Sequence, residues 1–329
     1  MTARAQDARA EPAGDERDLK VDALKCLAIL LVIATHILSL RREFQHVAPW
    51  LVSGMVAFNM PLFAGLSGWV LAGREGSHPG RFLWRKVLTL YVPYFAWIAI
   101  EAPLRKVSLA AMPARLFEAL VDPHAGMQMW FLAVLFWMFV VFTLARLVSR
   151  SDVWIGAVAV AVGAVGILPR ITVLGLDKVA WLYPFFILGY LLARSRSDYR
   201  KLIGILWVIV ALIAALGVLG HAALAGAYIA ALALSAVVIG IYAILPRRLL
   251  TSQAWLGRRT LGVYGAQMVV LPFLIVGAGW AGALASWALV AIAATLAAFG
   301  LERVPVARAL FLARWPRGRR RADREPDPV

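Results

Sequence analysis

The sequence predicts an all-α protein, a polytopic membrane helical bundle of about ten transmembrane helices with both termini cytoplasmic. Three observations predict this fold class. Hydrophobic residues make up 62% of the 329 residues, and the mean hydropathy of +0.78 is far above that of a soluble domain. Apolar runs close to the ~20 residues that cross a bilayer recur along the chain. Basic residues gather in alternate loops between these runs, which is an orientation signal in membrane proteins.

The apolar runs divide the chain into ten predicted spans. They cover residues 19–40, 51–73, 86–103, 127–147, 153–169, 180–194, 201–219, 226–245, 260–277 and 281–301. The fifth and sixth are short or contain Pro184, so a tilt, a kink or a partly re-entrant course is expected. The spans form one membrane domain, 19–301, between a polar N-terminal tail, 1–18, and a basic C-terminal tail, 302–329, which we expect to be disordered against anionic lipid headgroups.

The basic residues fix the expected orientation. With a cytoplasmic N-terminus, 27 of the 34 lysines and arginines lie in the tails and inner loops. This asymmetry predicts an even number of spans and a multi-pass protein of the plasma (inner) membrane. Because loops and tails account for the net charge of +16, membrane lipids are the expected partners and nucleic acid is not. The longest outer loop, 104–126, is amphipathic in its middle and is expected to form a short helix along the membrane surface.

The first span carries an informative pair, Lys25 and His36. Eleven residues are almost a whole number of helical turns, so both side chains lie on one face, roughly 16 Å apart along the axis. Ionisable groups inside a span usually face a protein interior or a wet cavity. The pair therefore predicts a passage with a basic mouth and a proton acceptor further in. In the alternative interpretation His36 caps a carbonyl, and Lys25 is an orientation signal paired with Asp22.

Further patches stand out from generic membrane sequence. They are FNMPLF at 58–63 followed by Ser67 and Gly68, RFLWRKVLTLYVPYFAW at 81–97, MWFL at 129–132 with FFILGY at 185–190, and LGRRTLGVYGAQ at 256–267. In this order and spacing they resemble the acyltransferase-3 family of integral membrane acyltransferases, and within it the fucose-acetylase-like sugar O-acetyltransferases. The resemblance covers about residues 19–301. It implies a ten-span bundle that transfers an acyl group, commonly acetyl, from cytoplasmic acyl-CoA to a hydroxyl of a sugar or other acceptor at or beyond the outer face.

The resemblance assigns roles that fit the chemistry of acyl transfer. The family's (Arg/Lys)-x10-His signature maps onto Lys25 and His36, and histidine is the usual base for taking a hydroxyl proton near neutral pH. Ser67 and Asn59 are candidate catalytic residues that contact polar groups or stabilise the oxyanion. The phosphates of acetyl-CoA, the expected donor, need cations. The candidates for these are Lys25, Arg81, Arg85 and Lys86. With one cysteine, Cys26, no Cys-based metal site is expected, and acyl transfer needs none.

Four residues are candidates for binding the acceptor. They are Trp130, Gln128, Glu101 and Gln267. The alternatives are an interface-belt aromatic for Trp130 and a solvated loop for Gln128. Glu101 pairs either with His36, which would raise its basicity, or with Arg105 four residues on, which would have no catalytic effect.

The chain departs from the family's pattern at three positions. Thr89 stands where an Arg-x-x-Arg motif would place its second arginine, Asn59 stands where relatives carry histidine, and Gln267 replaces a terminal histidine. These departures leave His36 as the one predicted intramembrane histidine. Two other classes of function stay open, a transporter of a lipid-linked sugar or small molecule and a non-catalytic partner in polysaccharide export. CoA-dependent labelling of an acceptor separates the enzyme from both.

Overall fold

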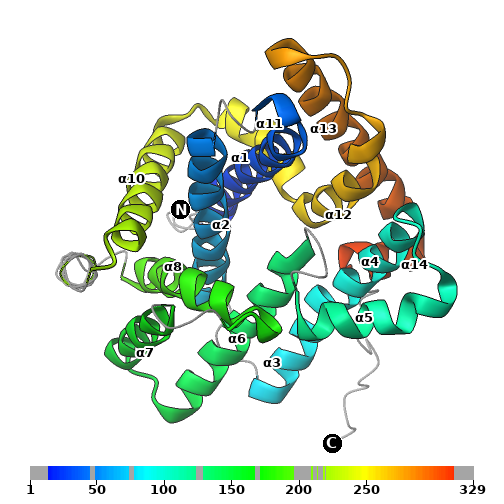
Figure 1. Ribbon diagram of the computed structural model, residues 1–329. Helices are drawn as coiled ribbons and strands as arrows, with labels where there is room; N and C mark the ends of the chain where they lie inside the picture. The colour runs from blue at the N-terminus through cyan, green and yellow to red at the C-terminus, as the bar shows by residue number, and fades with distance from the viewer. Residues whose placement is uncertain are drawn as a thin grey trace, which may run out of the picture.

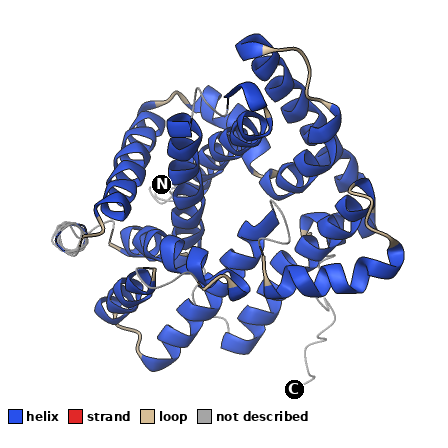
Figure 2. Cartoon of the chain, in the orientation of Figure 1, coloured by secondary structure: helices blue, strands red, loops and turns tan. Residues whose placement is uncertain are grey.

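The computed structural model describes residues 14–44, 49–73, 78–123, 129–166, 171–195 and 220–314, with three isolated residues between the last two ranges. Every regular element in this part of the chain is helical, as the sequence predicts (Figure 2). The elements are α1 (Gly14–Leu40), η1 (Arg42–Phe44), α2 (Pro49–Ala72), α3 (Pro79–Lys86), η2 (Val87–Tyr91), α4 (Val92–Leu104), η3 (Leu109–Ala111), α5 (Met112–Val121), α6 (Trp130–Val148), α7 (Asp152–Val165), η5 (Val173–Gly175), α8 (Leu176–Arg194), α10 (Ala222–Ile244), α11 (Arg247–Gly257), α12 (Thr260–Val270), η6 (Leu271–Phe273), α13 (Gly279–Arg303) and α14 (Pro305–Leu312).

Seven stretches in the described part are long and apolar enough to cross a membrane. They are 19–40, 51–72, 79–104, 130–148, 173–194, 222–244 and 279–303. Two further predicted spans are shorter apolar helices, 152–165 and 260–273. The predicted span 201–219 lies outside the described residues, apart from three isolated positions, so the count of ten stays a prediction. The third span begins at Pro79 and not at residue 86, because α3, the π-helical turn η2 and α4 form one continuous helix.

We name the two ends of the bundle after residues near the two ends of α1, the Asp22 end and the Arg41 end. The shorter helices α7 and α12 each run from one of these ends to the other. Helices α6 and α8 are parallel. Near the start of each, Lys178 lies 5.9 Å from the ring of Trp130, and at the far end Arg194 pairs with Asp152 at 3.2 Å. Helix α7 therefore returns the chain from the end of α6 to the start of α8.

Helix α12 makes a similar passage beside α1. It begins next to Gly257, whose backbone meets that of Asp22, and it leads to Val276 and Gly277, whose carbonyls accept hydrogen bonds from Arg41. Helix α1 packs on α2, α10, α11, α12 and α13, and the other helices form an arc around α1 and α2 (Figure 1). The first span is thus the centre of the bundle.

Small residues allow a close helix crossing between α2 and α8. A Cβ at Gly68 would lie 1.8 Å from the Phe186 carbonyl oxygen, and one at Gly189 would lie 2.0 Å from that of Gly65. Gly68 therefore permits the close packing of α2 on α8. Helix α8 continues from Leu176 to Arg194 through Pro184, so it is longer than the predicted span 180–194.

Two segments outside the spans also form helices. Helix α5 lies in the predicted outer loop and exposes Phe117, as expected for a helix along the membrane surface. The prediction of a disordered tail from residue 302 is wrong for its first part. Helix α14 packs on α4, α12 and α13, because Ala309 and Leu312 provide an apolar face that these helices bury. Residues 315–329 lie outside the described part.

Candidate active site

A cavity of about 270 Å³ lies between α1, α2, η2, α6 and α12. Its walls are mostly apolar, and polar side chains enter it at a few places. The lining residues are Lys25, Met60, Phe63, Ser67, Leu90, Phe131, Leu132, Leu135, Gly257, Arg258, Thr260, Leu261 and Tyr264. Seven residues separate Ser67 from Met60 on α2, so the cavity extends about 10 Å along this helix. An apolar cavity with a few convergent polar groups is typical of a small-molecule site.

Two cations and one carboxylate form the mouth of this cavity at the Asp22 end. The Lys25 ammonium lies 3.2 Å from one Asp22 carboxylate oxygen, and the Arg258 Nε lies 3.2 Å from the other. The predicted Lys25–Asp22 pair is therefore present, and Lys25 also lines the cavity. Orientation signal and cavity residue are thus compatible roles for the same side chain.

The deeper part of α1 carries His36 beside a small polar group. The Asn59 amide donates to the Thr35 hydroxyl at 3.4 Å, and this hydroxyl donates to the Leu31 carbonyl at 2.8 Å. Asn59 thus lies at the level of the residue that precedes His36. The buried Nδ1 of His36 and Oδ1 of Asn59 have no hydrogen-bond partner among the described residues. Buried polar atoms are normally paired, so such atoms mark a place where a bound polar group is expected.

Ser67 belongs to the other part of the site. It lies eight residues beyond Asn59 on α2, about 12 Å along the helix axis. It lines the cavity with Lys25, and its hydroxyl donates to the Phe63 carbonyl at 2.8 Å. The structure therefore brings Asn59 to the level of His36 and Ser67 to the cavity that Lys25 enters. It does not gather the three predicted catalytic residues at one point.

Glu101 and Gln267 are both buried, with exposed fractions of 2% and 1%. Of the two partners left open for Glu101, the structure has Arg105, whose guanidinium approaches one carboxylate oxygen at 2.7 Å. The second carboxylate oxygen, Oε2, has no partner in the part of the chain that is described. The same holds for both amide atoms of Gln267, which follows Tyr264 by one turn of α12.

The predicted phosphate-binding cations of the third span lie outside the cavity lining. Arg81 and Arg85 are exposed on α3, and the Lys86 ammonium lies 3.7 Å from the ring centroid of Phe139. The Thr89 hydroxyl donates to the Arg85 carbonyl at 2.9 Å, so this departure from the family pattern forms a bond within its own helix. Leu90, one turn beyond Lys86, is the residue through which this span reaches the cavity.

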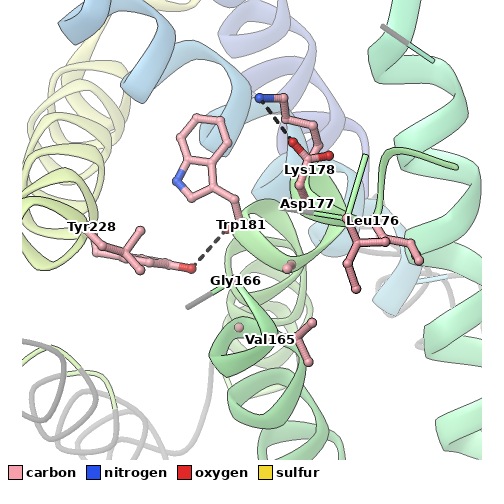
Figure 3. A pocket seen from close by; sticks show the side chains of 11 residues that line it. Val165, Gly166, Leu176, Asp177, Lys178, Trp181 and Tyr228 are labelled. Atoms are coloured by element: carbon pink, nitrogen blue, oxygen red, sulfur yellow. Dashed lines mark hydrogen bonds and ion pairs between the residues drawn. The ribbon is translucent and has the colours of Figure 1, made fainter. Parts of the chain in front are cut away.

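Trp130 begins α6 directly before Phe131, which lines the cavity. Gln128 lies outside the described residues. A second cavity, of about 220 Å³, lies between α7, α8 and α10, and Figure 3 shows its lining residues. There the Tyr228 hydroxyl donates to the Trp181 carbonyl at 3.2 Å, and Lys178 approaches Asp177 at 3.7 Å. None of the predicted site residues lines this second cavity.

Sequence reasoning missed Thr35, Arg258, Thr260 and Tyr264. The last three lie in the LGRRTLGVYGAQ stretch, from which only Gln267 was selected as a site residue. The signal was available in that stretch, because Arg258, Leu261 and Tyr264 follow one another at intervals of three residues, which places them along one side of a helix.

The apolar helices and the internal cavity with buried polar groups define a membrane protein with a site inside its bundle. The model of the acyltransferase-3 family, described as an acyltransferase domain, matches residues 18–303. Because this match covers most of the chain and every residue that lines the main cavity, the chain belongs to this family. Family and apolar helices together indicate a membrane acyltransferase. No curated protein and no solved structure matches the chain.

Proposed function

We propose that this chain is a membrane O-acyltransferase that moves an acyl group, such as acetyl, from cytoplasmic acyl-CoA to a hydroxyl of a sugar or exopolysaccharide-type acceptor at or beyond the outer face. One observation carries the proposal beyond family membership. The main cavity leads from a cationic mouth at the Asp22 end toward the level of Asn59, where buried polar atoms of Asn59 and His36 have no partner among the described residues. Acyl-CoA is a long anionic thioester, so its site needs cations for the phosphates and, further in, polar groups for the thioester.

In the proposed reaction His36 takes the proton of the acceptor hydroxyl. The hydroxyl oxygen attacks the thioester carbonyl carbon, and the carbonyl oxygen gains negative charge. Asn59 and Gln267 carry amides that can donate to this oxygen. As the intermediate collapses, the carbon–sulfur bond breaks and the imidazolium returns the proton to the leaving thiolate. The acyl group is then on the acceptor, and free coenzyme A leaves through the mouth.

The substrates occupy opposite parts of the bundle in this proposal. Lys25 lies at the mouth and receives donor phosphates, while Arg81, Arg85 and Lys86 on the neighbouring α3 attract the anionic head electrostatically. The acceptor approaches from the Arg41 end, where Trp130 presents an aromatic surface and Glu101 a carboxylate. Gln128 precedes Trp130 in the chain and is proposed to contact the acceptor as well.

The test is binding of acetyl-CoA and slow hydrolysis of its thioester by the purified protein in detergent. We expect His36→Ala to keep binding and to lose turnover by about 100-fold or more, which is the usual contribution of a general base. We expect Lys25→Ala and Arg85→Ala to weaken binding. The matched controls are His78→Ala and Arg248→Ala, because both wild-type side chains are exposed and remote from the cavity lining.

Three results would count against the proposal. Wild-type protein that does not bind acetyl-CoA excludes the donor, and movement of an unmodified lipid-linked sugar across proteoliposomes would then support transport. If His36→Ala hydrolyses the thioester at the wild-type rate, His36 is not the base. A wild-type protein that binds acetyl-CoA yet modifies no hydroxyl acceptor would favour the non-catalytic partner.

A further inference from the structure

Six charged side chains form a continuous group around the mouth of the main cavity. They are Asp22, Lys25, Arg258, Arg259, Glu302 and Arg314. Four are cations and two are carboxylates, so the group keeps two positive charges in excess. Helices α1 and α13, the two-residue link between α11 and α12, and the residues after α14 contribute to it. None of Arg258, Arg259 and Arg314 was among the cations expected to bind the donor.

Arg258 is the residue that joins the two halves of this group. Its side chain lines the main cavity and also a small neighbouring pocket, which Arg259, Glu302 and Arg314 share. The Arg258 backbone carbonyl accepts a hydrogen bond from the Arg314 guanidinium at 3.1 Å. A ligand that binds at the mouth therefore meets Arg258 first and finds Arg314 directly beside it.

The backbone fixes Arg258 in this place. The preceding residue, Gly257, lies so close to α1 that a Cβ on it would be 1.7 Å from the Asp22 carbonyl oxygen. Asp22 then holds the Arg258 Nε at 3.2 Å, while the two terminal nitrogens of this guanidinium have no partner among the described residues. The Arg258 side chain is 56% exposed. Its terminal nitrogens thus form a preorganised fork, the geometry that binds phosphate in a bidentate way.

Arg314 offers a second cation next to the first. Glu302 accepts from Arg314 at 2.6 Å and from Arg259 at 3.0 Å, so one carboxylate holds two guanidinium groups. Glu302 and Arg259 are mostly buried, whereas the Arg314 side chain is 45% exposed. Two arginines around one carboxylate have a net positive charge, and Arg314 is the arginine that a ligand can reach.

This arrangement fits a ligand that has a narrow arm and two separate phosphate groups on its head. We infer that Arg258 and Arg314 complete the donor site, with Arg258 and Lys25 contacting the diphosphate and Arg314 contacting the 3′-phosphate of a coenzyme A thioester. The arm then enters the apolar cavity, which Phe63 and Phe131 help to line. The inference rests on the proposed function and adds to it the means by which the chain recognises the phosphorylated ribose.

The experiment compares acetyl-CoA with acetyl-3′-dephospho-CoA by calorimetry, with the full chain in an uncharged detergent. We expect wild-type protein to bind acetyl-CoA about tenfold more tightly than acetyl-3′-dephospho-CoA, since a charge-assisted contact contributes on this order. Arg314→Ala removes this preference by weakening acetyl-CoA alone. Arg258→Ala weakens both ligands about 10- to 100-fold and leaves their ratio unchanged. The ratio within one preparation does not depend on the fraction of protein that is folded.

Arg303→Ala is the matched control. Its side chain is at the same end of the bundle but lies over the Phe299 ring at 4.3 Å, outside the group, so both affinities should stay at the wild-type level. If Arg258→Ala fails to fold, Arg258→Gln keeps a hydrogen-bonding side chain for Asp22 and is expected to show the same loss of affinity. Unchanged affinity for both ligands in this variant overturns the role of Arg258.

Four other outcomes are also decisive. If Arg314→Ala weakens both ligands equally or neither, the 3′-phosphate contact is overturned. If phosphatidylglycerol in nanodiscs competes with acetyl-CoA on wild-type protein and not on Arg314→Ala, Arg314 holds a lipid phosphate and the assignment is overturned. If wild-type protein binds neither thioester, the proposed function fails. If it binds both with equal affinity, the proposed function stands and only the 3′-phosphate contact is overturned.

Discussion

Arg41 stabilises the fold from a buried position that its place in the sequence does not indicate. In the predicted topology it directly follows the first span, 19–40, on the outer side of the membrane. In the structure its side chain is buried. The guanidinium donates to Glu43 at 2.9 Å, to the carbonyls of Val276 and Gly277 at 3.2 and 2.7 Å, and to the Ser286 hydroxyl at 3.3 Å. It ties the end of α1 to the loop before α13.

We predict that Arg41→Ala destabilises the protein by about 2 to 3 kcal/mol, the cost of removing a charged donor and leaving buried acceptors unpaired. Thermal unfolding in detergent checks this. The neighbouring Arg42 is exposed and provides the control, since Arg42→Ala removes the same charge and should leave the unfolding temperature within error. Equal unfolding temperatures for the two variants would show that the Arg41 contacts do not stabilise the fold.

The positions of some candidate site residues were predictable from the sequence. The Lys25–His36 spacing located the central helix and one cation of the cavity mouth. The spacing of Arg258 and Tyr264 places them along one side of a helix, but the cavity that this side lines depends on how α12 packs against α1 and α6. The partner of Glu101 was left open for the same reason, because Arg105 is close in sequence and the distance to His36 depends on the fold.

At the scale of the helix, close approach of two backbones is the feature that a hydropathy pattern does not reveal. The α2–α8 crossing depends on glycine at 68 and 189. We predict that Gly68→Ala destabilises the protein by about 1 to 3 kcal/mol, because the new methyl group would overlap the Phe186 carbonyl. The crossing forms one wall of the cavity, through Phe63 and Ser67, so acetyl-CoA binding should weaken as well.

Gly54→Ala is the control for this prediction. Gly54 lies on the same helix, and a Cβ there would meet nothing within 4 Å. The substitution should leave stability unchanged or raise it slightly, since alanine favours helix over glycine by up to about 1 kcal/mol. Thermal unfolding and ligand binding are compared for both variants. If Gly68→Ala is as stable as Gly54→Ala, the close crossing is absent from the protein.

Helix existence was well predicted from apolar run length, and helix ends were not. Helix α3 begins seven residues before the predicted span. The prediction missed this part because the cations of RFLWRK lower its mean hydropathy, although the segment is amphipathic and continues the same helix. Helix α14 was missed for a similar reason. Its apolar stretch is short and its neighbours are basic, so only the packing on α4, α12 and α13 reveals that it is ordered.

The arrangement of the whole molecule constrains its path through the membrane. Gly257 and Arg258 contact Asp22, and Lys20 donates to the Ala243 carbonyl, so the start of α1, the end of α10 and the end of α11 lie together. The chain must therefore cross the bundle an even number of times between residues 22 and 243. Helix α8 ends at the Asp22 end and α10 begins at the other end. The predicted span 201–219, which lies outside the described residues, would make the number of crossings even and stays a prediction.

We predict from this that residue 252 in α11 is on the same side of the membrane as the N-terminus, and that this side is the cytoplasm because most basic residues are there. Single cysteines at Ser151, Ser252 and Ser108, in a Cys26→Ser background, test it with a maleimide that does not cross membranes. Ser108→Cys, in the outer loop, should be labelled on intact cells. Ser151→Cys and Ser252→Cys should be labelled only after permeabilisation. Labelling of residue 252 but not 151 on intact cells would mean that the chain crosses an odd number of times between them, and the ten-span topology would then be wrong.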